Sequence, residues 1–241
     1  MINGKKVLTI IPARGGSKGL PNKNKRILYG KPLVSYPIEV AKNSKYIDEV
    51  YLSTDDRDIQ NIGIESGVNC PELRPKELAS DTATTFSVLE YIIKKYKSKK
   101  TIFDYLLLLE PTSPLTQSED VDSAIEKLDK NREKADSIVG ITKAETVHPE
   151  FCVELNKAGI LKPYKNDFSN VRRQDLDDVF FYDGSLYISD INALIKEESF
   201  YHSRTMGYIT KKWQSLEIDD IIDFYCVESI LENLEEIKSY E

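Results

Sequence analysis

Apolar residues in the first half of the chain come in short runs that alternate with helical stripes. The runs 7–11, 49–55 and 105–109 are rich in Val, Ile and Leu, and 105–109 is the most apolar of them, which is typical of a strand buried on both faces. Residues 32–45 and 56–67 carry apolar side chains at helical spacing. The order strand–helix–strand–helix predicts an α/β protein with a mainly parallel sheet and right-handed crossovers.

The second half continues this alternation with one interruption. The pattern predicts helices from 86 onward, over 118–130, over 191–198 and from Asp219 or Asp220 to the end, with strands over 136–142 and 179–188. From about 145 to 178 the helical period disappears, and the apolar runs 151–155 and 159–161 indicate a hairpin. A hairpin inserted into a regular α/β order is a candidate dimerisation arm.

Composition narrows the class of protein. A chain of 241 residues, 40% hydrophobic, suffices for one sizeable core, so we expect a single domain over 1–241 with an inserted region at about 145–178. The net charge of −7 argues against a nucleic-acid partner. No apolar run is long enough to span a bilayer, and the cysteines at 70, 152 and 226 fit neither a zinc site nor a disulfide framework. We therefore expect a soluble cytoplasmic protein without a membrane partner.

The loop that follows the first predicted strand is the most informative stretch. Residues 10–26 combine three glycines with five cationic side chains, namely Arg14, Lys18, Lys23, Lys25 and Arg26. Glycines let the backbone approach a ligand closely, and the cations suit a polyphosphate. Neither a Walker A loop nor a dinucleotide fingerprint is present. A solvated basic turn is the alternative, but open α/β sheets bind ligands at this edge.

The segment Pro12-Ala13-Arg14-Gly15-Gly16-Ser17-Lys18-Gly19-Leu20-Pro21, followed by Lys23-Asn24, resembles the signature loop of the CMP-sialic acid synthetases, or acylneuraminate cytidylyltransferases. The resemblance extends in five ordered segments over nearly the whole chain. It implies a Rossmann-like, three-layer α/β/α nucleotidyltransferase fold. The implied reaction joins CTP to an acidic nine-carbon sugar, giving a CMP-sugar and pyrophosphate.

A second segment, 73–85, holds small hydroxylated residues around Arg74 and Asp81. From the residues alone it is a loop with a helix N-cap at Asp81 or Thr82, and a helix N-terminus also presents free N–H groups to a ligand. The resemblance implies that it helps hold the nucleotide. The nucleotide-binding residues implied by the two segments are Ala13, Arg14, Gly15, Gly16, Ser17, Asn24, Arg74, Ser80, Asp81 and Thr82.

A sharp turn, Glu110-Pro111-Thr112-Ser113-Pro114, ends the central apolar strand. Two prolines prevent continuation of the sheet and hold the side chains at its edge. The related enzymes usually have glutamine at the position of Glu110, where it contacts the sugar, and Thr112 and Ser113 belong to the same segment. An ionised carboxylate accepts hydrogen bonds but donates none, so we expect altered sugar recognition. Thr116 replaces a usual arginine.

The resemblance also places Arg173 and Tyr187 near the acidic sugar, and an arginine is a natural bidentate partner for its carboxylate. A surface arginine on a loop is the alternative. Phe200 and Tyr201 stand where the family has two aromatics that reach from one subunit to the sugar in the other. A role of both rings in filling the core of a dimer is nearly as well supported.

The last informative segment is 213–220. Glu217 and Asp219 alternate along an extended stretch, which points both carboxylates the same way. Such hard oxygen ligands suit Mg²⁺, or Mn²⁺, that bridges substrate phosphates, although acidic residues before a helix are often only caps. The family has two aspartates at these positions, so the side chain of Glu217 is one methylene longer than that of the usual aspartate.

The sequence thus predicts a cytidylyltransferase for N-acetylneuraminate or a related nonulosonate such as legionaminate, acting as a homodimer. Arg14, Lys18 and Lys23 are expected to stabilise charge on the triphosphate, with a metal ion at Asp219. Two alternatives stay open. One is a cytidylyltransferase for the eight-carbon 3-deoxy sugar acid of lipopolysaccharide, and the other is a nucleotide-binding regulator without turnover.

Overall fold

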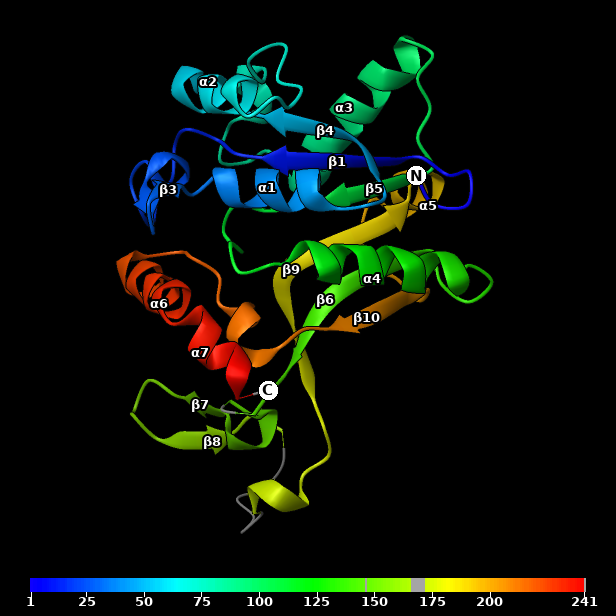
Figure 1. Ribbon diagram of the computed structural model, residues 1–241. Coiled ribbons are helices and arrows are strands. Elements are labelled where there is room, and N and C mark those ends of the chain that lie inside the picture. The colour runs from blue at the N-terminus through cyan, green and yellow to red at the C-terminus, as the bar shows by residue number, and fades with distance from the viewer. Residues whose placement is uncertain (146, 166–171, 241) are drawn as a thin grey trace.

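The protein is built on one six-stranded sheet, seen in a computed structural model that describes residues 1–145, 147–165 and 172–240 (Figure 1). The spatial order of the strands is β10-β6-β9-β5-β1-β4. Their bounds are β1 Val7–Pro12, β4 Ile47–Ser53, β5 Tyr105–Leu108, β6 Ser137–Lys143, β9 Phe180–Asp190 and β10 Thr205–Ile209. All pairs are parallel except the two that β9 makes with β5 and β6. The predicted mainly parallel sheet is confirmed.

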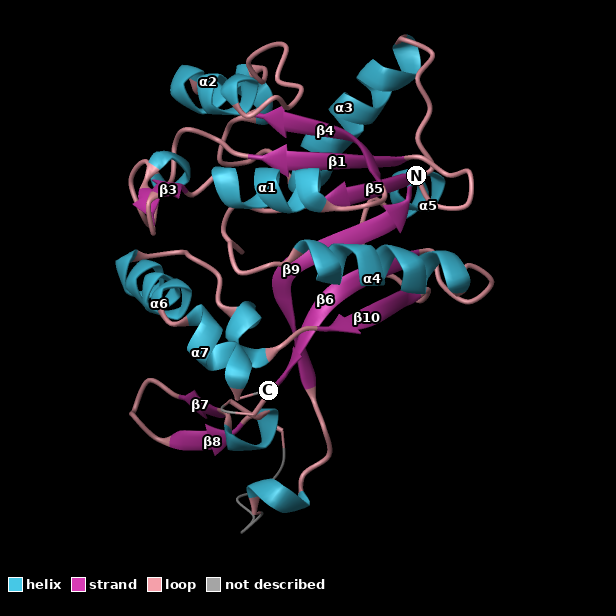
Figure 2. Cartoon of the chain, in the orientation of Figure 1, coloured by secondary structure: helices cyan, strands magenta, loops and turns pink. Residues whose placement is uncertain are grey.

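Helices cover both faces of this sheet (Figure 2). Their bounds are α1 Ser35–Asn43, α2 Arg57–Glu65, α3 Thr85–Ser98, α4 Ser118–Lys130, α5 Ile191–Glu197, α6 Ile221–Glu232 and α7 Leu234–Ser239. Short 3-10 helices lie between them, namely η1 Lys23–Lys25, η2 Lys76–Leu78, η3 Pro149–Phe151, η4 Arg173–Asp175 and η5 Lys212–Ser215.

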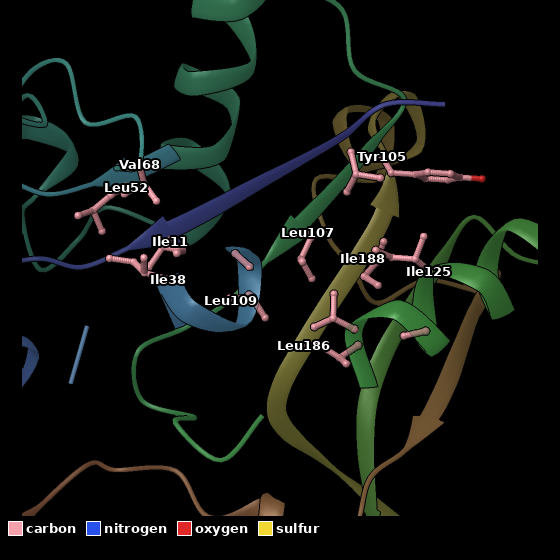
Figure 3. Packing of buried hydrophobic residues seen from close by; sticks show 14 of the residues in the cluster. Ile11, Ile38, Leu52, Val68, Tyr105, Leu107, Leu109, Ile125, Leu186 and Ile188 are labelled. Atoms are coloured by element: carbon pink, nitrogen blue, oxygen red, sulfur yellow. The ribbon is translucent and has the colours of Figure 1, made fainter. Parts of the chain in front are cut away.

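The two-residue period of the buried strands creates a core on each face. Along β1, Val7 and Ile11 pack with α1, α2 and α4, whereas Leu8 and Ile10 pack with α3 and α5. Figure 3 shows part of the first core, where Ile11 lies beside Ile38 of α1 and side chains of the neighbouring strands continue the layer. The three-layer α/β/α architecture is confirmed.

A third apolar cluster joins distant parts of the chain. Leu20, Leu28 and Leu33, from the loop after β1 and its short strands β2 (Ile27–Leu28) and β3 (Lys31–Pro32), pack against Ile218 and Phe224. The backbone N–H of Tyr29 also donates to Glu228 of α6 (3.4 Å). The amino-terminal loop and the carboxy-terminal helix therefore form one unit, visible as β3 and α6 on the same side in Figure 1.

An arm projects from the sheet. The strands β7 (Val153–Leu155) and β8 (Leu161–Pro163) form an antiparallel hairpin, and it lies beyond the end of β9 that is remote from α5 (Figure 1). The segment η4 lies at the far end of this arm, away from β1 and β5.

One predicted boundary needs correction, and one strand was missed. The first helix does not begin at Pro32, which belongs to β3, but at Ser35, because the backbone N–H groups of Leu33 and Val34 are bonded to the preceding loop (2.9 and 3.0 Å). The strand β10 was not predicted at all. Its residues are only partly buried at the sheet edge, so they lack a clear apolar pattern.

No helix in the described part of the chain is long and apolar enough to cross a membrane.

Asp183 of β9 is a buried carboxylate that joins three segments. It accepts hydrogen bonds from the Ser185 backbone N–H (3.0 Å), the Ser185 hydroxyl (2.6 Å), Thr142 of β6 (2.8 Å) and Thr210 after β10. Every buried oxygen is thus matched by donors from its own strand and its neighbours.

We predict that Asp183→Ala lowers the free energy of unfolding by about 2–4 kcal/mol, because buried donors lose their acceptor. Chemical denaturation measures this change. The matched control is Glu232→Ala, an exposed carboxylate on α6, which should change stability by less than about 0.5 kcal/mol. Equal stabilities of the two variants would contradict the structural role of Asp183.

Candidate active site

The cationic loop leaves β1 at the carboxyl edge of the sheet, and neighbouring residues hold its shape. The backbone N–H of Gly15 donates to Asp55, which follows β4 (2.9 Å). The buried side chain of Asn24 donates to the backbone carbonyl of Arg14 (2.9 Å). These two hydrogen bonds fix the shape of the loop, which lies in the position where open α/β sheets bind their ligands.

Lys23 joins this loop to the segment before α6. Its ammonium group donates to the backbone carbonyl of Ile218 (2.6 Å) and pairs with Asp219 (3.2 Å). The side chain of Lys23 is only 11% exposed, whereas that of Asp219 is 83% exposed. At Gly19 the two segments approach so closely that a Cβ atom would collide with the backbone carbonyl of Asp219.

Between these segments and the end of β5 lies a cleft of about 420 Å³, which we call the phosphate lobe. Its lining residues are Pro12, Arg14, Ser17, Lys18, Gly19, Lys23, Asn24, Glu110, Pro111, Thr112 and Asp219. Three cationic side chains share it with two carboxylates. The cleft thus combines groups that bind phosphate with groups that bind a metal cation.

Two of the cations are paired with one aspartate. Arg14 Nη1 lies 2.9 Å from Asp81 Oδ1, and Lys18 Nζ lies 2.9 Å from Asp81 Oδ2. The two bonded cations lower the pKa of Asp81. Such exposed pairs contribute little to stability, so an anionic ligand can replace the carboxylate at small cost.

A second hollow of about 250 Å³, which we call the nucleoside lobe, shares Pro12, Arg14 and Glu110 with the first. Its other lining residues are Arg74, Leu78, Ser80, Asp81, Ala83, Thr84, Thr85 and Val88. Two of the predicted nucleotide residues are adjacent but outside this lining: Thr82, whose hydroxyl lies 3.2 Å from that of Ser80, and the buried Ala13, whose N–H donates to Ser53 (2.8 Å).

Arg74 is fixed rather than free in this lobe. Its guanidinium donates to the hydroxyl and the carbonyl of Ser53 (2.9 and 2.6 Å), and burial lowers its pKa. Arg74 therefore ties the end of β4 to the lobe wall. The N-cap of α3 is Thr84, whose hydroxyl accepts from the N–H of Ser87 (3.1 Å), so the predicted cap at Asp81 or Thr82 is wrong.

The turn after β5 is hydrogen-bonded to the segments that carry Glu217 and Asp219 and to β9. The backbone carbonyl of Thr112 accepts from the N–H of Ile218 (2.8 Å). The buried hydroxyl of Ser113 donates to the carbonyl of Gly184 (3.0 Å) and lies 3.4 Å from Glu217. Thr112 lines the cleft, whereas Ser113 supports its wall.

Glu217 is packed against Gly184 and is not among the residues that line the cleft. Gly184 has a positive φ of 71°, and a Cβ there would collide with the Glu217 carboxylate. Burial, followed by the negative charges of Glu110 and Asp219, raises the pKa of Glu217 to about 7. Burial likewise raises the pKa of Glu110. Three carboxylates therefore repel one another, which favours binding of a cation.

Among the described residues, however, no cluster of three or more His, Cys, Asp or Glu side chains has the geometry of a metal site. Glu217 and Asp219 on their own supply two carboxylates. Mg²⁺ commonly takes one or two protein carboxylates and completes its shell with phosphate oxygens and water.

The predicted aromatic residues lie close to one another. The ring centroids of Tyr187 and Tyr201 are 6.2 Å apart, and those of Tyr182 and Tyr201 are 4.4 Å apart. Burial, and then the charge of Glu110, raises the pKa of Tyr187. Tyr201 is 44% exposed, while Phe200 is buried in the core with α3 and α5.

The expectation that Phe200 and Tyr201 reach across to another subunit stays a prediction. Both rings contact Tyr187 of their own chain. The side chain of Arg173 lies outside the described part of the structure. Its backbone belongs to η4 at the far end of the arm, away from this chain's own cleft (Figure 1).

Sequence reasoning missed Asp55, a residue that shapes the cationic loop. Asp55, which orders Gly15, directly follows the predicted second strand, so the rule that parallel strands present ligands at their carboxyl ends could have identified it. Gly15 and Gly16 belong to the predicted phosphate loop but are absent from the residues that line either lobe.

We predict that Glu217→Gln raises the thermal stability of the metal-free protein at pH 8 but not at pH 4. The folded state raises the pKa of Glu217 from 4.5 to about 7, so its contribution is most favourable below pH 4.5 and is lost as the pH rises towards 7. Thermal unfolding at both pH values measures the difference. The control is Glu133→Gln, an exposed loop carboxylate, and a pH-independent effect of Glu217→Gln would contradict the assignment.

The chain is similar to known proteins over most of its length. A family described as Cytidylyltransferase matches residues 8–239. The chain is 31% identical over 229 residues to the CMP-N,N'-diacetyllegionaminic acid synthase of Legionella pneumophila, covering 94% of this chain and 97% of that protein. It is 32% identical to the pseudaminic acid cytidylyltransferase of Campylobacter jejuni, covering 90% and 93% of the two chains.

A third relative is longer. The chain is 33% identical over 221 residues to the N-acylneuraminate cytidylyltransferase of Streptococcus agalactiae, covering 91% of this chain but only 52% of that protein. Among solved structures, a CMP:2-keto-3-deoxy-manno-octonic acid synthetase complexed with CTP superposes with a TM-score of 0.68 at 17% identity, over 95% of this chain and 99% of that one. This likeness shows the fold alone. The chain belongs to the cytidylyltransferase family, and its predicted resemblance to the CMP-sialic acid synthetases is confirmed.

Proposed function

We propose that this protein transfers the cytidylyl group of CTP to a nine-carbon acidic sugar, N-acetylneuraminate or a related nonulosonate such as legionaminate. The sugar's anomeric oxygen attacks the α-phosphorus, the bond to the pyrophosphate oxygen breaks, and the hydroxyl loses its proton. One observation carries the proposal: a glycine-rich cationic loop faces a pair of carboxylates across a single cleft. Charge neutralisation and positioning of this kind dominate catalysis of such transfers.

The cations would bind the triphosphate. Arg14 and Lys18 reach into the phosphate lobe, and their present partner, Asp81, is itself an anion that a phosphate group can replace. The nucleoside would occupy the adjoining lobe, against Arg74 and Ser80. Lys23 would act at the inner end of the lobe, where it already lies between the loop and Asp219.

Asp219, together with Glu217, would hold Mg²⁺ or Mn²⁺. The raised pKa of Glu217 supports this proposal, because its cause includes repulsion by neighbouring carboxylates that a dication would relieve. When bound, the metal ion would neutralise charge on the phosphate oxygens. The exposed Asp219 carboxylate faces the cleft and would orient that ion.

The sugar would lie between the end of β5 and the aromatic residues of β9. Thr112 and Glu110 line the cleft there, and Tyr187 lies opposite Leu108 of β5, two residues before Glu110. Relatives that match nearly the full chain are described as acting on legionaminic and pseudaminic acids, which are nine-carbon sugars of this class. Their similarity supports a nonulosonate over the eight-carbon acid.

We also propose that the protein acts as a homodimer through its arm. Large apolar side chains are exposed there, namely Val153, Leu155, Ile160, Leu161, Tyr164, Phe180 and Phe181. An exposed apolar patch of this kind marks an interaction site. A second copy would also explain a sugar-binding role for Arg173, whose backbone is remote from its own cleft. Free cysteines, including the buried Cys70, support action in the reducing cytoplasm.

The direct test of the reaction is pyrophosphate release with CTP, Mg²⁺ and a panel of nine- and eight-carbon sugar acids. We predict turnover with a nine-carbon acid, and a loss of roughly 10²–10³-fold in kcat/KM for Arg14→Ala with unchanged thermal stability. Arg132→Ala, an exposed arginine remote from the loop, is the control. CTP binding without turnover of any sugar would favour a regulatory protein, and preference for the eight-carbon acid would favour the other enzyme.

For the dimer, we predict that wild-type protein has twice the chain mass in solution and that Leu161→Glu shifts it to the monomer. A charge on each copy would have to be buried at the interface. Light scattering coupled to size-exclusion chromatography measures the mass. Ile102→Glu changes another exposed apolar residue, outside the arm, and should leave the dimer intact. A dimeric Leu161→Glu variant would show that the arm is not the interface.

A further inference from the structure

The peptide group between Arg14 and Gly15 is bonded to a side chain at each of its polar atoms. Its carbonyl oxygen, which belongs to Arg14, accepts a hydrogen bond from Asn24 Nδ2 (2.9 Å). Its N–H, which belongs to Gly15, donates to Asp55 Oδ1 (2.9 Å). Two hydrogen bonds of normal length therefore fix the plane of this one peptide group, next to the cationic side chain of Arg14.

Asp55 takes the place of a backbone carbonyl in this arrangement. The strands β1 and β4 are parallel neighbours in the sheet, with Pro12 opposite Ser53 (Figure 1). The ladder continues beyond β1, because the Ala13 N–H donates to the carbonyl of Ser53 (2.8 Å). In a parallel ladder alternate residues of a strand donate to the same neighbour, so the next donor is the N–H of Gly15. It is bonded to the side chain of Asp55, and the chain turns into the cationic loop with this anchor kept.

The residue at position 15 makes such an anchor necessary. A Cβ atom at Gly15 would lie 2.8 Å from the Cβ atom of Asp56, so the close approach of the two segments requires glycine. Asp56 is itself held in place, because its carboxylate caps α2 and pairs with Lys25 (2.9 Å). Glycine also adopts backbone conformations that other residues avoid, so the peptide group before it would turn easily without hydrogen bonds to hold it.

The anchored peptide group lies between two cations that converge on one anion. Arg14 Nη1 and Lys18 Nζ each lie 2.9 Å from an oxygen of Asp81. Arg14 precedes the Arg14–Gly15 peptide bond and Lys18 follows it, so rotation there would move one cation relative to the other. Convergence on one anionic group is the arrangement that a bound phosphate needs, and it is most effective when it exists before the ligand arrives.

We propose that Asp55 is a positioning residue for cytidylyl transfer, which holds Arg14 and Lys18 in the arrangement that binds the triphosphate. This inference rests on the proposed function and adds to it a residue that lines neither lobe of the cleft. Asp55 acts by accepting the hydrogen bond from Gly15. The oxygen of its side chain is required for this role, and the negative charge is not.

Two substitutions at one position test this role. Asp55→Asn keeps an oxygen that can accept the Gly15 N–H, whereas Asp55→Ala removes it. We expect Asp55→Ala to weaken the binding of inorganic tripolyphosphate, measured by calorimetry, and to lower kcat/KM for CTP, each by roughly tenfold or more, because the cations are displaced. Asp55→Asn should stay within about threefold of the wild type in both measurements.

A hydrogen bond of the same kind at the other end of β1 supplies the matched control. The backbone N–H of Val7, the first residue of β1, donates to Asp48 Oδ2 of β4 (2.8 Å). Asp48→Ala should lower the thermal stability of the protein and leave tripolyphosphate binding and kcat/KM as in the wild type. A general loss of stability is thereby separated from a loss of positioning.

A double-mutant cycle tests whether Asp55 acts through the cation. In an Arg14→Ala background, Asp55→Ala should cause a smaller further loss of kcat/KM than it causes in the wild type, because one of the groups that it positions is already absent. Equal losses in the two backgrounds would contradict the inference.

Wild-type affinity and turnover in Asp55→Ala would also refute the inference. An Asp55→Asn variant that is at least tenfold defective would refute it too, since the charge would then be essential, and this result does not depend on whether Asp55→Ala folds. If the wild type turns over no sugar of the panel, the proposed function fails, and the tripolyphosphate affinities of the variants still decide whether Asp55 positions the loop.

Discussion

The contact between Lys23 and the backbone carbonyl of Ile218 holds the site together. It joins the first loop of the chain to the segment before the last long helix, two regions separated by 195 residues. A lysine buried to this extent needs partners for its ammonium group, and the carbonyl of Ile218 and the carboxylate of Asp219 provide them. Because this contact brings the cationic loop against the acidic segment, cationic side chains and carboxylates share one cleft.

Apolar packing also joins the two segments that Lys23 and Ile218 connect. Leu20 and Leu33 from the loop region share a core with Ile218 and Phe224, and the guanidinium of Arg26 lies 4.9 Å from the Phe224 ring centre. The loop is therefore held by apolar packing as well as by the hydrogen bond of Lys23. Its remaining freedom lies in Arg14 and Lys18, whose exposed pairs with Asp81 are weak and replaceable. Rigid positioning with exchangeable counter-charges suits a site that binds and releases a polyphosphate.

The charges of the cleft are unequally matched. Arg14, Lys18 and Lys23 each have an acidic partner, whereas Glu110 is without one in the described chain and Glu217 has only a long contact to Ser113. The negative charges of Glu110 and Asp219 contribute to the raised pKa of Glu217. A cation bound near these carboxylates would relieve their repulsion.

Much of the fold was predictable because its signals are local. The continuous apolar runs of β1 and β5, and the cationic loop directly after β1, follow from burial on both faces and from the position of ligands in parallel sheets. What could not be predicted depends on tertiary contacts. The edge strand β10 lacks a buried face. The N-cap of α3 is Thr84, one of several residues in this segment that could cap a helix. Phe200 is buried in the core of its own chain.

In the site, too, local features could be predicted from the sequence and tertiary contacts could not. Residue type and spacing indicated the cations of the loop, but the sequence could not show that Lys23 is committed to Ile218 or that Arg74 is committed to Ser53. It also gave no means of knowing that Asp81 pairs with both Arg14 and Lys18. These are contacts between residues far apart in sequence, and only the folded chain brings them together.

The most direct test of this account is a crystal structure of the protein with CTP and Mg²⁺. The account predicts triphosphate oxygens within hydrogen-bonding distance of Arg14 and Lys18, both ion pairs to Asp81 open, and Lys23 still bonded to the carbonyl of Ile218. A triphosphate bound away from the loop, with the Asp81 pairs intact, would contradict it.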